Sequence, residues 1–432
     1  MTGSLLQVYL HIGAMKTGTS YLQQLLVENK RRLSADGVLF PGRPGWGEQV
    51  RGVRDMLRLA ADDEMRVSMA GAWQRLQEEI RRYDGRAALL SMEFMSFARE
   101  PRARALVESL APADVHVVLT VRDAGRVLPA QWQESTQNRK TSSWQEYTDA
   151  VLQGTNADNP IWRTSMRALN IPRMLDVWGP LVPADRLHVV LVPPAGAPST
   201  LLWERFATAV GIEAARYAPP RRRRNESLGY VSADLMRRAN VELQKLPLSD
   251  YQRTVKSYLC KQVLSARTGE PKMTMTTALA DFAQHWNSTM TDAVRASGAQ
   301  LCGDLSDLAV DPPGSATAVD PPPQDALLDA ASDAVVGLEQ LIEFRRLRLE
   351  SGDDDTEQFS PTLGPSRSQL RAGWEAARNP VGDAVSAVVA ASREAVELRQ
   401  RRRSLDGRDD AAAAALRRAT RLGRAALGRL RR

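Results

Sequence analysis

The chain has 432 residues and is 43% hydrophobic, which is enough for a large core and, by length, for two or three domains. Its two cysteines, Cys260 and Cys302, exclude a disulfide framework, and no stretch approaches the roughly 18 apolar residues that span a bilayer. Residues 399–432 hold twelve Arg and three Asp, a charge of +9, so the formal net charge of +7 leaves −2 for the rest. With no recognisable secretory signal, we expect a cytoplasmic protein.

Apolar runs that alternate with helical periodicity dominate the first 200 residues. Strands are predicted at 5–13, 37–41, 87–92, 115–121 and 187–192, with helices at 21–33 and 72–83. Residues 225–300 are mostly helical in pattern, and 303–305 open a last short strand or a loop. This alternation predicts an α/β fold, a parallel sheet flanked by helices on both faces.

The composition changes near residue 310. We therefore expect one domain over 1–309, followed by a linker at 310–323 that is rich in Asp and Pro. Residues 324–432 are predicted to form a helical, partly disordered and basic C-terminal extension.

Ligands of open parallel sheets bind beyond the carboxyl ends of the strands. The first such end continues into a glycine-containing loop before a helix, with the sequence Gly13-Ala14-Met15-Lys16-Thr17-Gly18-Thr19-Ser20. Such a loop presents backbone N–H groups and the positive end of the helix dipole, which together bind phosphate or sulfate. The nucleoside-triphosphate P-loop requires Lys directly after its last Gly, where this chain has Thr19. A P-loop kinase or other phosphoryl transferase, with Ser20 as magnesium ligand, is therefore the alternative.

The segment from Lys16 to Ser20 resembles the 5′-phosphosulfate loop, Lys-x-Gly-Thr-[Ser/Thr], of sulfotransferases that use 3′-phosphoadenosine 5′-phosphosulfate. The resemblance is to bacterial members, especially those of actinomycetes, and covers roughly 5–309. It implies a P-loop NTPase-like sulfotransferase fold, sulfuryl transfer to a hydroxyl or amine, and no metal. In this family the equivalent of Lys16 contacts the bridging oxygen of the donor, where negative charge builds as the S–O bond breaks. The remaining donor-binding residues expected in this loop are Thr17, Gly18, Thr19 and Ser20.

A second anion site is expected after the strand at 115–121. Arg122 and Arg126 match in part the family's 3′-phosphate motif, Arg-[Asp/Asn]-Pro-x-x-Arg with a Ser eight residues after the first Arg. Ala130 stands at that Ser position, so the hydroxyl donor is missing or comes from elsewhere. The alternative for Arg122 is a strand-end Arg that pairs with a carboxylate.

A late basic loop is the second source of 3′-phosphate contacts. Arg224, Asn225 and Ser227 are expected to close over that phosphate, as a late basic or Asn-x-Ser segment does in several sulfotransferases. A solvated basic turn, in which Ser227 caps the following helix, is the alternative.

Transfer to a hydroxyl needs a general base near the acceptor oxygen. Carbohydrate-modifying sulfotransferases often use a Glu after the third strand, and Glu93 stands there. The alternative is a Glu paired with a nearby Arg or Lys. His11 and His116 lie inside predicted strands and are expected to be core residues, and no His/Cys cluster has metal-ligand spacing.

The acceptor is expected to be a small molecule or glycan, such as a carbohydrate, a glycolipid or a secondary metabolite, and not a nucleic acid. The basic tail, 399–432, is interpreted as an exposed solvated helix, a surface helix that contacts acidic lipid, or an oligomerisation arm. A nucleic-acid- or membrane-binding protein driven by this tail is the third class of function.

Overall fold

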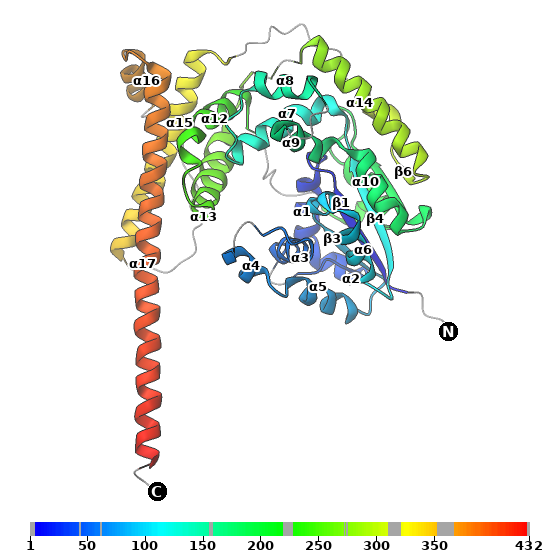
Figure 1. Cartoon of the computed structure of the whole chain (residues 1–432), viewed down its shortest axis with the longest axis horizontal. Coiled ribbons are helices and arrows are strands. Elements are labelled where there is room, and N and C mark those ends of the chain that lie inside the picture. Colours follow the sequence, from blue (N-terminus) through cyan, green and yellow to red (C-terminus); the bar gives the residue numbers. More distant parts are fainter. Residues whose placement is uncertain are drawn as a thin grey trace. The chain divides into compact units, whose positions relative to one another are not determined.

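The computed structural model describes residues 5–42, 45–60, 63–154, 159–218, 228–271, 273, 275–309, 321–351 and 367–429 (Figure 1). Contacts divide the chain into two compact units, one of residues 1–132, 144–225 and 273–318, the other of 133–143, 226–272 and 319–432. Residues 133–143 and 226–272 thus belong with the C-terminal segments, although the sequence analysis grouped them with 1–309. Most of the predicted linker, 310–320, lies outside the described residues.

A six-stranded parallel sheet forms the centre of the first unit, in the order β2-β3-β1-β4-β5-β6. The strands are β1 (Gln7–Gly13), β2 (Val38–Leu39), β3 (Ala87–Ser91), β4 (Asp114–Val121), β5 (Leu187–Leu191) and β6 (Gln300–Cys302). The prediction of an α/β fold with a parallel sheet flanked by helices is confirmed. Central strands β1, β3 and β4 are almost entirely buried, as their near-continuous apolar sequences require.

The last strand lies earlier than the segment 303–305 that the sequence singled out. Gly303 has φ +118°, in the left-handed region, so the extended conformation ends there. The Asp304 side chain then accepts from the Ser306 N–H at 2.8 Å and caps the 3₁₀ turn η7 (Leu305–Leu308). The candidate strand at 303–305 is therefore a loop and a capped turn.

The helices of the first unit surround this sheet. They are α1 (Thr19–Glu28), α2 (Lys30–Ala35), α3 (Gly47–Leu57), α4 (Asp63–Met69), α5 (Ala72–Arg81), α6 (Glu100–Glu108), α8 (Trp144–Leu152), α9 (Pro160–Leu169), α10 (Ile171–Trp178), α11 (Leu201–Ala209) and α14 (Thr277–Ala296). Helix α7 (Ala124–Gln137) begins in this unit, and its last five residues, 133–137, belong to the second. Short 3₁₀ turns are η1 (Glu93–Phe97), η2 (Gly179–Leu181), η3 (Ala184–Arg186) and η4 (Ala214–Arg216). One apolar cluster joins Tyr9, Leu89 and Val118 of the sheet to Leu25 of α1 and Phe206 of α11.

The single helix predicted at 21–33 is divided at Asn29. The Asn29 amide donates to the carbonyl oxygens of Leu25 and Ala218, both at 2.9 Å. Side-chain bonds of this kind compete with helical backbone bonds, so α1 ends at Glu28 and α2 begins at Lys30.

The second unit is helical. It contains α12 (Tyr230–Leu243), α13 (Leu248–Asp250), the π-helix η5 (Tyr251–Val263), η6 (Leu264–Ala266), α15 (Gln324–Ser351), α16 (Arg367–Glu375) and α17 (Pro380–Arg429). Two buried ion pairs, Arg399 with Asp250 and Arg267 with Asp333, hold α17 and α15 to the segment 248–267. Figure 1 shows α17 as one long helix that runs, orange to red, towards the C-terminus.

In the described part of the chain, no helix has both the length and the apolar character needed to cross a bilayer.

Three histidines lie in the sheet. His11 is fully buried between Ser91, whose Oγ is 2.8 Å from His11 Nδ1, and Phe206, and it packs as the predicted core residue. His116 is buried too, with its Nδ1 3.0 Å from Nε2 of His188 on the next strand. Burial lowers the pKa of His11 to about 3 and that of His188 to about 4, the charge of His116 adding to the second effect. His11 is therefore uncharged near neutral pH.

Folding stability should fall as the pH drops below about 6.5. The unfolded chain, with an ordinary His pKa of 6.5, then binds more protons than the native one, whose His pKa values are lower. For His11 alone the loss is about 1.4 kcal/mol per pH unit, or about 2 kcal/mol at pH 5. Urea unfolding of wild type and His11→Asn at pH 7.5 and 5 tests this. An equally steep loss in both proteins would contradict the assignment to His11.

Candidate functional site

The carboxyl ends of β1, β3 and β4 meet at the middle of the sheet, because these three strands are parallel neighbours. The segments that follow them are 14–18, the 3₁₀ turn η1 and the start of α7. The expected donor-binding residues lie in the first and third of these segments and the expected base, Glu93, in the second, and the topology brings the three segments together. The candidate site described below lies entirely within the first unit.

Hydrogen bonds to Thr120 of β4 hold the loop between β1 and α1 against the sheet. The Ala14 N–H donates to the carbonyl oxygen of Thr120 at 2.9 Å. The Thr17 hydroxyl, only 1% exposed, donates to the Ala14 carbonyl at 2.6 Å and also contacts the Thr120 hydroxyl. The Thr17 side chain thus fixes the shape of the loop, and its hydroxyl faces the protein.

Two loop positions need glycine. Gly18 precedes α1 with φ +83°, and a Cβ there would lie 2.5 Å from Cδ2 of Leu202, at the start of α11. Gly13 has φ +104°, and a Cβ there would lie 3.0 Å from Cβ of Glu93. The second contact shows how closely Glu93 packs against the loop. Lys16 also has a positive φ, 63°, an uncommon conformation for a residue with a side chain.

Three consecutive backbone N–H groups open α1 without an acceptor. Among the described residues, no oxygen accepts from the N–H of Gly18, Thr19 or Ser20, and no side chain caps the helix. Donors of this kind at a helix N-terminus, together with the helix dipole and a nearby ammonium group such as that of Lys16, favour a bound anion.

Arg122, at the end of β4, extends the positive charge beside this loop. Its Nη1 donates to the carbonyl oxygen of Lys16 at 3.2 Å, whereas its buried Nε has no acceptor among the described residues. Burial, and then the charge of Arg126, lower the pKa of Arg122 to about 10. Within the described residues Arg122 forms no ion pair. The alternative interpretation, in which Arg122 pairs with a carboxylate at the end of the strand, is therefore not what the structure shows.

Arg126 is held by the protein. It pairs through Nε with the buried carboxylate of Asp123, and its Nη1 donates to the Pro193 carbonyl at 2.9 Å. The same carboxylate accepts from the Arg126 N–H at 2.8 Å, and the Ala124 N–H donates to Asn287 Oδ1 at 2.8 Å. The N-terminus of α7 is thus capped by the protein itself. Arg126 has a structural partner, and the geometry does not support its expected role in donor binding.

Glu93 opens η1 and is half-buried. Its Oε2 accepts from the Gln23 amide of α1 at 2.9 Å, and the same amide lies 3.3 Å from the Ser91 carbonyl oxygen. Among the described residues no cation pairs with Glu93 within 4.0 Å, although the Glu93 carboxylate raises the pKa of Arg54 against the lowering by burial. A carboxylate oriented by one amide and left unpaired can accept a proton.

Sequence reasoning missed Gln23 and Arg54. Both lie on helices, where an isolated polar residue has no distinguishing pattern, and only the packing of α1 and α3 brings them to Glu93. Gln23 is buried on the inner face of α1 beside Leu22 and Leu26, as expected of an orienting group.

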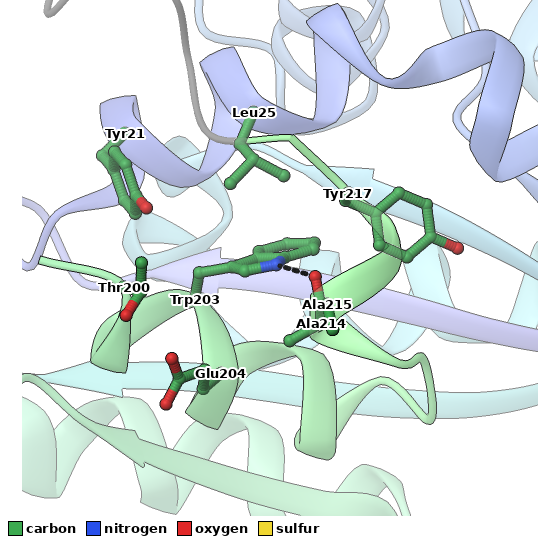
Figure 2. A pocket seen from close by; sticks show the side chains of 8 residues that line it. All are labelled: Tyr21, Leu25, Thr200, Trp203, Glu204, Ala214, Ala215 and Tyr217. Atoms are coloured by element: carbon green, nitrogen blue, oxygen red, sulfur yellow. Dashed lines mark hydrogen bonds between the residues drawn. The ribbon is translucent and has the colours of Figure 1, made fainter.

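A cavity of about 300 Å³ adjoins the end of the loop, since Tyr21 follows Ser20 directly. Figure 2 shows Trp203 across its middle, with Tyr21 and Leu25 on one side and Tyr217 beyond the indole. The Trp203 indole N–H donates to the Ala214 carbonyl at 3.1 Å and so is fixed in place. The lining is aromatic and mainly apolar, which suits a flat ring.

Some of the predicted site residues are not part of the site described above. Arg224, Asn225 and Ser227 fall outside the described residues. Ala130 lies on α7 and brings no hydroxyl. Within the described ranges, no group of three or more His, Cys, Asp and Glu is placed to hold a metal ion.

Comparison with protein-family models, with curated proteins and with solved structures found no match to the chain.

Proposed function

We propose that the protein is a sulfotransferase that moves a sulfuryl group from 3′-phosphoadenosine 5′-phosphosulfate to an acceptor hydroxyl or amine. One observation carries the proposal: the N–H groups of Gly18, Thr19 and Ser20 have no acceptor in the part of the chain that the structure describes, they lie in the same loop as Lys16, and Glu93 packs against that loop. An anion site after β1 then lies beside a carboxylate that follows the neighbouring strand β3 and has no ion pair among the described residues, as transfer from an anionic donor requires.

In the proposed reaction the acceptor oxygen attacks sulfur while the bond from sulfur to the bridging oxygen breaks. The electron pair of that bond leaves with the nucleotide phosphate, whose growing charge Lys16 and the N–H groups stabilise. The acceptor proton passes to Glu93, which Gln23 orients. The P-loop-like sulfotransferase fold belongs to the same proposal.

A kinase is the second candidate, and the loop disfavours it. Thr19, which stands where the triphosphate P-loop has its Lys, is only 5% exposed. A buried hydroxyl there cannot replace an ammonium that reaches the terminal phosphates.

The 3′-phosphate of the donor is assigned to Arg122, whose guanidinium keeps a buried N–H without an acceptor in the described part of the chain. The flat base of the nucleotide is assigned to the aromatic cavity beside Tyr21. The expected contacts of Arg224, Asn225 and Ser227 stay part of the proposal.

Calorimetry separates the two candidates. The proposed enzyme should bind 3′-phosphoadenosine 5′-phosphate without magnesium, with a Kd in the micromolar range, about −8 kcal/mol. A kinase should instead bind ATP with magnesium. Binding of ATP and magnesium, with no binding of the desulfated donor, would overturn the proposal.

Two neighbouring arginines should give opposite results. Arg122→Ala should weaken binding of 3′-phosphoadenosine 5′-phosphate by about 10- to 100-fold, because a charge-assisted hydrogen bond contributes about 1.5–3 kcal/mol. Arg126→Ala should keep the affinity but lower the free energy of unfolding by about 3 kcal/mol, because the buried Asp123 loses its partner. Calorimetry and urea unfolding of both variants test this. The converse pattern would reverse the two assignments.

The acceptor is proposed to be a hydroxyl of a carbohydrate, a glycolipid or a secondary metabolite. A cytoplasmic location is proposed too, since the free thiols of Cys260 and Cys302 suit a reducing compartment. If peripheral membrane contact through 399–432 is only an accessory property, deletion of 406–432, which keeps the buried Arg399–Asp250 pair, should leave donor binding intact.

A further inference from the structure

Arg54 of α3 lies near Glu93, and one of its buried N–H donors has no acceptor among the described residues. Among the described residues its one hydrogen bond runs from Nη1 to the Met65 sulfur at 3.4 Å, a weak acceptor. Its Nε is buried and has no acceptor there. Burial lowers the pKa of Arg54, while the charge of Glu93 raises it. The buried Nε–H of this guanidinium therefore has no oxygen acceptor among the described residues.

Leaving the Nε–H of Arg54 without an acceptor costs free energy, because a buried charged donor loses its hydration. Glu93 does not supply the acceptor, since it accepts from Gln23 and has no ion pair among the described residues. An anion bound beside Glu93 would satisfy Arg54.

The surface around Glu93 also offers two aromatic rings. Phe94 and Phe97 stack with centroids 5.6 Å apart and are both half-buried. The guanidinium of Arg54 lies 4.8 Å from the Phe94 centroid, and that of the exposed Arg167 lies 5.5 Å from the Phe97 centroid. A row of four side chains, Arg54-Phe94-Phe97-Arg167, therefore starts beside Glu93 with a cation at each end.

From this arrangement we infer that the acceptor is anionic: it carries a carboxylate, sulfate or phosphate that Arg54 binds, next to an apolar or ring portion that lies on Phe94 and Phe97. Without Arg54, the ionised Glu93 would repel such an acceptor. Arg54 is then a specificity-determining residue for the proposed reaction, and this inference rests on Glu93 being its base.

A matched pair of probes tests the charge preference without knowledge of the acceptor. Phenylacetate and phenylacetamide share a ring and a shape but differ in charge. Their binding to the full chain is followed by ligand-observed NMR, with and without saturating 3′-phosphoadenosine 5′-phosphate. Phenylacetate should bind with a Kd of about 1 mM, roughly tenfold more tightly than the amide.

Arg54→Gln should remove this preference and bind both probes alike, while Arg54→Lys should keep part of it. Arg167→Gln should weaken phenylacetate less, since Arg167 is exposed and screened. Arg104→Gln, which removes an exposed arginine paired with Glu100 on α6, is the matched control and should bind both probes as wild type does. Thermal unfolding of each variant verifies folding.

The inference is overturned if wild type binds neither probe at about 10 mM, if it binds both equally, or if Arg54→Gln keeps the preference. Failure of the sulfotransferase proposal is recognised separately, by lack of binding of 3′-phosphoadenosine 5′-phosphate itself. If that nucleotide binds and the probes show no charge preference, only the anionic acceptor is wrong.

Discussion

Lys16→Ala should abolish sulfuryl transfer and weaken donor binding. The variant keeps the glycines and the three N–H groups of the loop, so the loss isolates the ammonium group. Removal of one preorganised group that stabilises developing charge typically costs about 10²- to 10³-fold in turnover. Mass spectrometry of the sulfated product, with an acceptor found by screening, measures turnover. Calorimetry with 3′-phosphoadenosine 5′-phosphate measures binding.

Two further variants, Lys16→Arg and Arg31→Ala, serve as comparisons for Lys16→Ala. The first keeps the charge but spreads it over a larger planar group, so it should restore binding better than turnover. The second removes an exposed cation on α2 and should change neither. Unchanged turnover in Lys16→Ala would refute the assignment of the loop to the donor.

Glu93→Gln should retain donor binding and lose turnover by about 10²- to 10⁴-fold, the usual contribution of general base catalysis. The amide can still accept from Gln23, so the side chain should keep its place while losing its ability to take a proton. Single-turnover rates at saturating donor separate this loss from any change in acceptor affinity.

Two further variants, Gln23→Leu and Glu100→Gln, serve as comparisons for Glu93→Gln. Gln23→Leu should lower turnover more mildly, because it removes the amide that orients the carboxylate but leaves the base. Glu100→Gln removes an exposed carboxylate on α6, beyond the end of η1, and should have no effect on turnover. If Glu93→Gln turns over normally, another group accepts the proton.

The strands and the loop were predictable because their signals are local. Continuous apolar runs require strands buried on both faces, and Gly13 and Gly18 mark backbone conformations that other residues adopt with strain. The order of the strands was not predictable in the same way. Strand β1 lies between β3 and β4, and that position makes Glu93 and Arg122 neighbours of the loop.

The two arginines after β4 show where sequence reasoning stops. Both have the same side chain and lie in one motif, yet Arg126 pairs with Asp123 while Arg122 keeps an unaccepted N–H among the described residues. Burial and the direction of each side chain decide this difference, and the local amino-acid sequence predicts neither of them. Likewise, the division of 21–33 at Asn29 depends on the carbonyl of Ala218, 189 residues away.

By itself the sequence determined the α/β class, the buried strands and the glycine-containing loop after the first strand, because hydrophobic periodicity and glycine geometry act over a few residues. Only the tertiary structure decided which polar groups surround that loop. It placed Gln23 and Arg54 beside Glu93, paired Arg126 with Asp123 and left the Nε of Arg122 without an acceptor in the described part of the chain. The physical reason is that desolvation and hydrogen-bond pairing depend on contacts between residues distant in sequence, which a local pattern does not encode.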